Sequence, residues 1–317
     1  MERNDTVDIM KGIGIISVVL GHCWLLPATV IHFIYSFHMP LFFIIAGYFY
    51  KEREVVASLK KDAKRLLLPY IVFATLFVLK FSASSIVKNG DYTGILKTLF
   101  IAFYASAGNH TSYYLSWVPD IGVIWFLPAM YVCKNVFCIM NKQPNGGVLT
   151  TFVAITATLI DVYLVNLPLG ILVGCSAMIF YQIGYYFKVH KISALMFTVG
   201  LSCWFISLKF SSIGVGCCSY QLYPIDVIGA SAATATVYLI SRQMNYLPTL
   251  LVGGVKWLGK YSMIVLCMHY VEQIIDINSR LHTQSWYSYL AFEFMLIIPF
   301  TYCCTKNKYT KSIFQVK

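Results

Sequence analysis

Three histidines occupy positions where acid–base chemistry is expected in an otherwise apolar chain. His22, His38 and His269 each lie inside a long apolar run, and the chain has 7 histidines in all. Within a membrane an ionisable side chain costs about 2.5–3.5 kcal/mol, so each one suggests a function. Neutral imidazole titrates near physiological pH and is the commonest general base in enzymes. We expect His22 and His38 to be catalytic, and His269 to orient the base or hold a substrate.

The first apolar run also carries Asp8 and Lys11. Lys11 precedes His22 by eleven residues, about 1100° of helical rotation, which places both on one face of a helix and about 16 Å apart along its axis. One stripe of one helix therefore joins a cation near one membrane surface to a titratable base farther along. We expect Lys11 to bind an anionic cofactor and Asp8 to bind or orient a substrate.

The last histidine has polar neighbours at helical spacing. Glu272 lies one turn beyond His269, and Ser262 lies seven residues before it on the same face. We expect Ser262 and Glu272 to orient the base or hold the acceptor. Metal ligation is the alternative explanation for such histidines. No HxxxH motif supports it, so we expect no metal.

The composition indicates a membrane protein. Apolar residues make up 58% of the 317 residues and charged residues only 12%, about half the roughly 25% of soluble domains. The mean hydropathy is +0.69. So few charges cannot cover a soluble fold of this size, and a disordered chain is not this apolar. Nucleic-acid binding is excluded as well, because the basic residues are dispersed among short loops with no separate domain.

Ten apolar runs are long enough to cross a bilayer. We therefore predict an all-α polytopic protein of about ten transmembrane helices in one domain, residues 1–317. The runs are 7–26, 31–50, 66–88, 121–140, 148–166, 169–187, 193–210, 224–241, 256–276 and 286–304. In the largest loop, residues 95–107 are apolar but too short to cross, which predicts an interfacial or re-entrant helix. Tyr113, Tyr114 and Trp117 in this loop either roof an acceptor site or anchor the loop in the headgroups.

The positive charge sorts to one side of these spans. The net charge is +11, and a cytoplasmic N-terminus leaves only five of the 24 Lys and Arg on the outer side: Lys80, Lys88, Lys97, Lys209 and Arg280. By the positive-inside rule both termini are cytoplasmic. Lys64 and Arg65 close the most basic inner loop. They either anchor it to anionic lipid or form a phosphate-binding mouth.

At these residues the sequence resembles a known family, the integral-membrane acyltransferases called acyltransferase family 3. Within it, the chain is most similar to the fucose 4-O-acetylase-like sugar O-acetylases. The specific matches are VDIMKGIGIISVVLGH at 7–22 and YSFHMPLFFIIAGY at 35–48, and weaker ones lie at 65–70, 125–127 and 258–269. Lys11 stands where many members have arginine, Ala46 where serine is common, and Leu266 where tyrosine is frequent.

The resemblance implies an O-acetyltransferase of the bacterial cytoplasmic membrane. Such an enzyme takes an acetyl (acyl) group from cytoplasmic acetyl-CoA and places it on a hydroxyl of an extracytoplasmic glycan or lipid-linked sugar. By resemblance His22 is the essential first-helix histidine and Arg65 is the basic residue before Pro-Tyr. We expect Trp125, in one of the weaker matches, to bind or orient the substrate. Lys11, Lys64 and Arg65 would then bind CoA. A transporter of a small or acyl-bearing solute is the alternative that intramembrane histidines also permit. The acceptor sugar and a homo-oligomeric state are left open.

Overall fold

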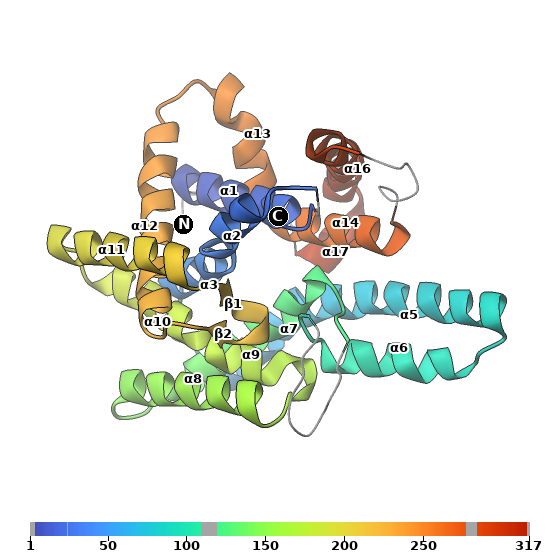
Figure 1. The fold of residues 1–317 in the computed structure, drawn as a ribbon, viewed down its shortest axis with the longest axis horizontal. Helices are drawn as coiled ribbons and strands as arrows, with labels where there is room; N and C mark the ends of the chain where they lie inside the picture. Colours follow the sequence, from blue (N-terminus) through green and yellow to red (C-terminus); the bar gives the residue numbers. More distant parts are fainter. Residues whose placement is uncertain (1–3, 24, 109–118, 277–283, 316–317) are drawn as a thin grey trace.

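The computed structural model describes residues 4–23, 25–108, 119–276 and 284–315, and these residues are mainly helical (Figure 1). Tyr113, Tyr114 and Trp117 lie outside the described residues. The N-terminal half contains α1 (Asp5–Gly21), α2 (Ala28–Tyr35), α3 (His38–Tyr48), α4 (Val55–Asp62), the π-helical turn η1 (Ala63–Leu67), α5 (Leu68–Asn89), α6 (Thr93–Tyr104), η2 (Val123–Trp125), α7 (Phe126–Met140) and α8 (Gly146–Tyr163).

The C-terminal half continues with more helices and one small hairpin. Its helices are η3 (Pro168–Gly170), α9 (Ile171–Ser176), α10 (Met178–Val189), α11 (Ala194–Phe210), η4 (Val215–Cys217), α12 (Ile225–Met244), α13 (Thr249–Lys260), α14 (Ser262–Ile275), α16 (Trp286–Lys306) and α17 (Lys308–Phe314). The hairpin strands β1 (Ile213–Gly214) and β2 (Ser219–Tyr220) pair antiparallel, with Ile213 opposite Tyr220. The protein is thus an all-α polytopic membrane protein.

Each predicted span coincides with one helix or with two helices that meet at a bend. Among the described residues, five helices are long and apolar enough to cross a membrane, or up to seven if each bent pair counts as one span. α1 and α11 fall short of this measure at 17 residues each. The total of ten spans and the cytoplasmic termini therefore stay predictions. The apolar segment 95–107 is confirmed as mostly helical, because α6 covers Thr93–Tyr104.

Two of the predicted spans are sharply bent. α13 and α14 meet at Tyr261 at an angle of 77°, so the predicted span 256–276 is not one straight helix. α9 and α10 meet at an angle of 47°. A third break, at Ser36 and Phe37, divides the predicted span 31–50 into α2 and α3. These breaks place Ser262 and His38 at the first residues of their helices.

Helix α1 lies at the centre of the fold, against α3, α12, α13 and α14 (Figure 1). Asn4 caps the N-terminus of α1, because its side chain accepts a hydrogen bond from the Val7 amide at 3.3 Å. The negative charges of Asp5 and Asp8 in the first turn interact favourably with the positive end of the helix dipole. The α5–α6 hairpin extends away from this centre (Figure 1). The figure therefore shows a helical body with one long arm.

Glycines bring α1 and α13 into backbone contact. A Cβ atom at Gly259 would overlap the carbonyl oxygen of Asp8, and one at Gly12 would overlap the carbonyl oxygen of Val255. Gly47 and Gly184 make the same kind of contact between α3 and α10. Small residues allow such close approach where apolar lipid supplies no hydrophobic drive for helix association. The position of α1, and of His22 at its end, thus depends on Gly259.

We expect Gly259→Ala to lower the melting temperature of the detergent-solubilised protein, because the new methyl group must separate α13 from α1. Overpacking of this kind typically costs about 1–3 kcal/mol. The matched control is Gly254→Ala on the same helix, where a Cβ meets nothing within 4 Å. Thermal unfolding followed by size-exclusion chromatography measures both variants. Equal melting temperatures for the two variants would contradict the glycine contact.

Candidate active site

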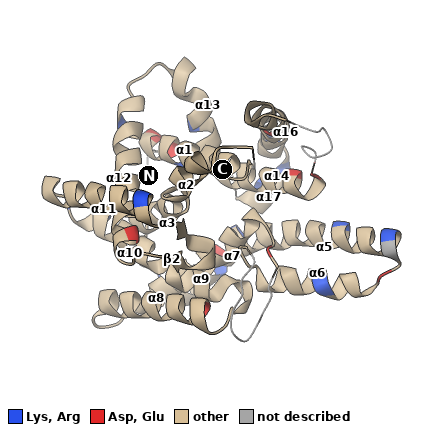
Figure 2. Cartoon of the chain, viewed as in Figure 1, with Lys and Arg blue, Asp and Glu red and all other residues tan. Residues whose placement is uncertain are grey.

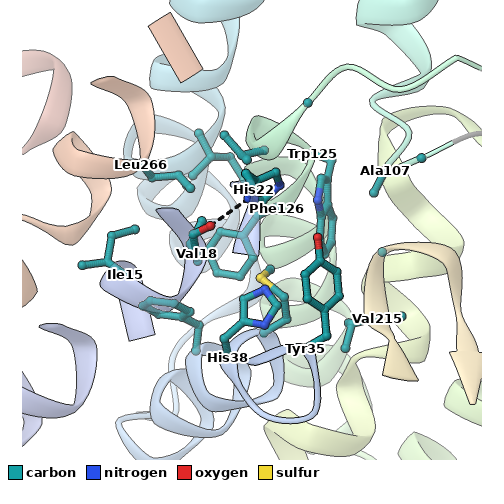
Figure 3. A pocket seen from close by; sticks show the side chains of 18 of the residues that line it. Ile15, Val18, His22, Tyr35, His38, Ala107, Trp125, Phe126, Val215 and Leu266 are labelled. Atoms are coloured by element: carbon teal, nitrogen blue, oxygen red, sulfur yellow. Dashed lines mark hydrogen bonds between the residues drawn. The ribbon is translucent and has the colours of Figure 1, made fainter. Parts of the chain in front are cut away.

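A cavity of about 270 Å³ lies where α1, α3, η2, α14 and the 213–217 segment converge (Figure 3). Its wall is mostly apolar, and this wall includes Ile15, Val18, Met39, Phe42, Phe126, Val215 and Leu266. His22, Tyr35, His38, Trp125, Asp120 and Ser262 contribute its polar groups. Ligand sites commonly combine an apolar wall with a few placed polar groups in this way.

His22 lies in the cavity wall just beyond the last residue of α1. Its Nδ1 lies 2.8 Å from the carbonyl oxygen of Val18 (Figure 3). A carbonyl oxygen only accepts, so Nδ1 must carry the hydrogen and donate it. The bond therefore fixes the neutral tautomer in which Nε2 holds the lone pair. That nitrogen is the one a general base needs.

His38 repeats this arrangement at the first residue of α3. Its Nδ1 donates to the carbonyl oxygen of Ile34 at 2.9 Å, so its Nε2 also holds the lone pair. The Tyr35 ring packs edge-on against the imidazole, with centroids 4.9 Å apart. His38 is buried and His22 is half-buried. His22 is thus the more accessible of the two bases.

His269 packs against His22. The two rings meet edge-on with centroids 5.4 Å apart, although His269 itself does not line the cavity. His269 Nδ1 lies 3.2 Å from Glu293 Oε1, and its Nε2 lies 3.3 Å from Gln273 Nε2. Glu272 belongs to the same cluster: one ligand atom each from His269, Glu272 and Glu293 lie within 4.8 Å of one another.

The structure separates the other predicted residues into two groups. Ser262 and Trp125 line the cavity together with the two histidines. Asp8, Lys11, Lys64 and Arg65 lie outside the described lining, as do His269 and Glu272. Asp8 is buried and Lys11 is half-buried on α1. They are therefore candidates for positioning or for the approach to the cavity.

Lys64 and Arg65 lie on the π-helical turn η1 and are exposed. Such turns occur frequently at functional sites. Leu66, the residue after Arg65, lines the cavity. Asp62, the residue before η1, is buried and forms an ion pair with Lys134 of α7 at 2.5 Å. This pair fixes the basic turn against the helix that begins beside Trp125.

The sequence interpretation overlooked three residues of this region. Glu293 is a carboxylate in the middle of the last predicted span, so the intramembrane-charge argument that singled out the histidines applied to it as well. Tyr35 and Asp120 line the cavity. Tyr35 comes three residues before His38, on the preceding helix, whereas Asp120 lies at the edge of a loop that gives no periodic signal.

Fold and site together define a polytopic membrane protein with a histidine-lined cavity inside its helical body. The family model of the acyltransferase domain matches residues 4–278, and the chain belongs to this family, acyltransferase family 3. Neither the comparison with curated proteins nor that with solved structures finds a match. The protein is a membrane acyltransferase.

We expect Lys134→Met to destabilise the protein, because it leaves the Asp62 carboxylate buried without its cation. Breaking a buried pair costs about 3–5 kcal/mol. Asp62→Asn combined with Lys134→Met should recover much of this loss, as measured by melting temperature. Lys142→Met is the control, since its partner Glu54 lies 3.6 Å away and is 88% exposed. If the double variant loses as much stability as Lys134→Met and Asp62→Asn lose together when made singly, the coupling is contradicted.

Proposed function

We propose that this acyltransferase moves an acetyl group from cytoplasmic acetyl-CoA to a hydroxyl of an extracytoplasmic cell-surface glycan or lipid-linked sugar. The cavity beside His22 Nε2 carries this proposal. It is an apolar space reached by a base whose tautomer is fixed by the Val18 carbonyl. Family membership favours acyl transfer over the transport alternative. The proposed location is the bacterial cytoplasmic membrane.

The cavity wall supports a donor that approaches from the basic turn. The wall includes Leu66, next to Arg65, and also Asp120 and Cys217 from the loops at the predicted outer side. With about 270 Å³ of space, the cavity suits the acetyl thioester and the end of the pantetheine arm rather than a whole CoA molecule. The phosphates of CoA would stay near Lys64 and Arg65, with Lys11 along the approach. Charge-assisted bonds to Arg and Lys are the usual means of holding phosphates.

The proposed reaction uses His22 as a general base. Nε2 takes the proton of the acceptor hydroxyl, and the acceptor oxygen attacks the thioester carbonyl carbon. The tetrahedral intermediate collapses with cleavage of the C–S bond. The imidazolium then returns the proton to the CoA thiolate, so His22 ends neutral and the products are the O-acetylated acceptor and CoA. His38 and Ser262 would orient the acceptor, and His269 holds the His22 ring from behind.

The acceptor side is proposed to lie around Trp125 and Tyr35. Figure 3 shows the Tyr35 side chain directed toward Trp125. Aromatic rings with nearby hydrogen-bonding groups suit the apolar faces and hydroxyls of a sugar. Asp120, which is exposed, contributes a carboxylate to the same part of the wall. This arrangement favours a hydroxylated acceptor over a purely apolar one.

We expect His22→Gln to reduce acetyl transfer by about 10²–10⁴, the usual contribution of a positioned general base. The assay incubates membranes with radiolabelled acetyl-CoA and with surface glycan from cells that lack the protein. The control is His190→Gln, because His190 is exposed and stacks on Tyr186 away from the cavity. Unchanged transfer by a folded His22→Gln protein would remove His22 from the catalytic role.

We expect Arg65→Ala to raise KM for acetyl-CoA with little change in kcat, because the lost charge serves binding. A charged hydrogen bond contributes about 1.5–3 kcal/mol, or roughly a 10–100-fold change in KM. Lys142→Ala is the control for loss of another basic side chain from the predicted inner side. An unchanged KM in Arg65→Ala would favour lipid anchoring as the role of the basic turn.

A further inference from the structure

The cluster behind His22 contains buried ligating atoms without hydrogen-bond partners. His269 and Glu293 are both 0% exposed. His269 Nδ1 and Glu293 Oε1 lie 3.2 Å apart, yet their geometry does not form a hydrogen bond. Among the described residues, neither these two atoms nor Glu293 Oε2 has another hydrogen-bond partner. Burying a polar atom without a hydrogen bond costs far more free energy than burying a hydrogen-bonded one, so the cluster requires an explanation.

Neighbouring side chains do not complete the cluster. Glu272 and Tyr289 lie close enough to influence the Glu293 carboxylate. Neither contact, however, has hydrogen-bond geometry at either oxygen of Glu293. Glu272 is itself buried at 4% exposure, so two carboxylates share a nearly dry space. Two carboxylates this close together repel each other when both are charged, and a cation between them removes that repulsion.

The spacing of the atoms suits a divalent metal ion. Nitrogen and oxygen ligands about 2.0–2.2 Å from a tetrahedral zinc lie roughly 3.3–3.6 Å from each other. The 3.2 Å between His269 Nδ1 and Glu293 Oε1 is close to this edge length. The third ligand atom, from Glu272, lies within 4.8 Å of the other two, so a small side-chain rotation would bring it into range. His269 and Glu272 project from one turn of α14, while Glu293 comes from α16.

We propose that His269, Glu272 and Glu293 bind one zinc ion that joins α14 to α16 behind His22. One imidazole with two carboxylates is a nitrogen and oxygen set that suits zinc. A dication with two carboxylates and a neutral imidazole has no net charge, so the ion lowers the free-energy cost of burying the two carboxylates. With Nδ1 on the ion, the hydrogen of His269 lies on Nε2, so the Gln273 amide must present its oxygen to that nitrogen. The ion would hold the His269 ring, and through it the edge-on contact with His22. The site is expected whatever acyl group or acceptor the enzyme uses.

The spacing of residues within α14 does not by itself indicate this site. The proposal revises the expectation from the sequence that the protein binds no metal. Two ligands lie three residues apart, but the third is contributed by a helix about twenty residues farther along. No local motif therefore contains the full set. The intramembrane carboxylate Glu293 was the one available sequence signal.

The first test measures metal in the full-length protein, purified in detergent with an affinity tag that contains no histidine. Elemental analysis by mass spectrometry should find about one zinc per chain, as a single structural site holds one ion. Glu293→Gln and His269→Asn should each lose it. Cys267→Ala is the matched control, because it alters a buried thiol on α14 and should keep the metal. Retention of zinc by both ligand variants would overturn the proposal.

The second test needs no variant, so it holds even if the substitutions prevent folding. X-ray absorption at the zinc edge of the wild-type protein should show nitrogen and oxygen neighbours at about 2.0–2.2 Å and no sulfur near 2.3 Å. The chain has 10 cysteines, so a sulfur shell would assign the zinc to thiols and refute this site. Protein that contains no zinc, both as purified and after incubation with zinc sulfate, also refutes it.

Discussion

The two histidines of the cavity depend on one constraint: in apolar surroundings, every backbone polar group must find a partner within the protein. α1 ends at Gly21, and the His22 amide turns to Val19 rather than to Val18. The Val18 carbonyl therefore accepts from the His22 side chain instead. At the break between α2 and α3, the Ile34 carbonyl accepts from the Phe37 amide at 3.3 Å and also from the His38 side chain. Each imidazole donates to a carbonyl at a helix end and, by donating from Nδ1, leaves Nε2 as the basic nitrogen. Helix termination and the chemistry of the site thus have one cause.

The same constraint explains how far the sequence could predict the fold. Each predicted apolar run became a helix or a bent pair, since hydropathy reports which segments avoid water. Hydropathy does not report the direction of a helix, so it did not predict the bend at Tyr261: no proline lies there, and the flanking Lys260 and Ser262 are compatible with a continuous helix. The break at Ser36 was equally hidden, although Pro40 follows closely. These two breaks place His38 and Ser262 at the cavity, so its shape could not be predicted from periodicity alone.

The candidate residues were easier to predict from the sequence than their arrangement, because ionisable groups in apolar runs stand out whatever the direction of the helices. Glu293 satisfies that criterion and was overlooked only because no motif accompanies it.

Several lysines of the predicted inner side contact other helices in addition to contributing to the charge bias. Lys134 pairs with Asp62, Lys256 with Asp5 at 2.9 Å, and Lys188 donates to the Tyr50 carbonyl at 2.7 Å. Each contact joins the ends of two helices that are distant in sequence. Part of the positive charge therefore stabilises the packing of the helices. Figure 2 shows the remaining charge spread thinly over the helices, with several positive residues along the α5–α6 hairpin. Lys64 and Arg65 remain exposed on their π-helical turn, and exposure is what a phosphate-binding role requires.

The proposed transfer from acyl-CoA has to protect a thioester from water while a proton moves. The mostly apolar wall, from Ile15 and Val18 to Leu266, suits the first task, since it offers water few partners. The second task needs a base that is neutral at rest, because a permanently charged group would be costly in this wall. Imidazole is both basic and neutral at rest, whereas a carboxylate is basic but charged. This explains why the cavity wall carries histidines while the buried carboxylates Glu272 and Glu293 lie behind them. Asp120 also lines the wall, but it is exposed to solvent, whereas Glu272 and Glu293 are buried and can act only through the base.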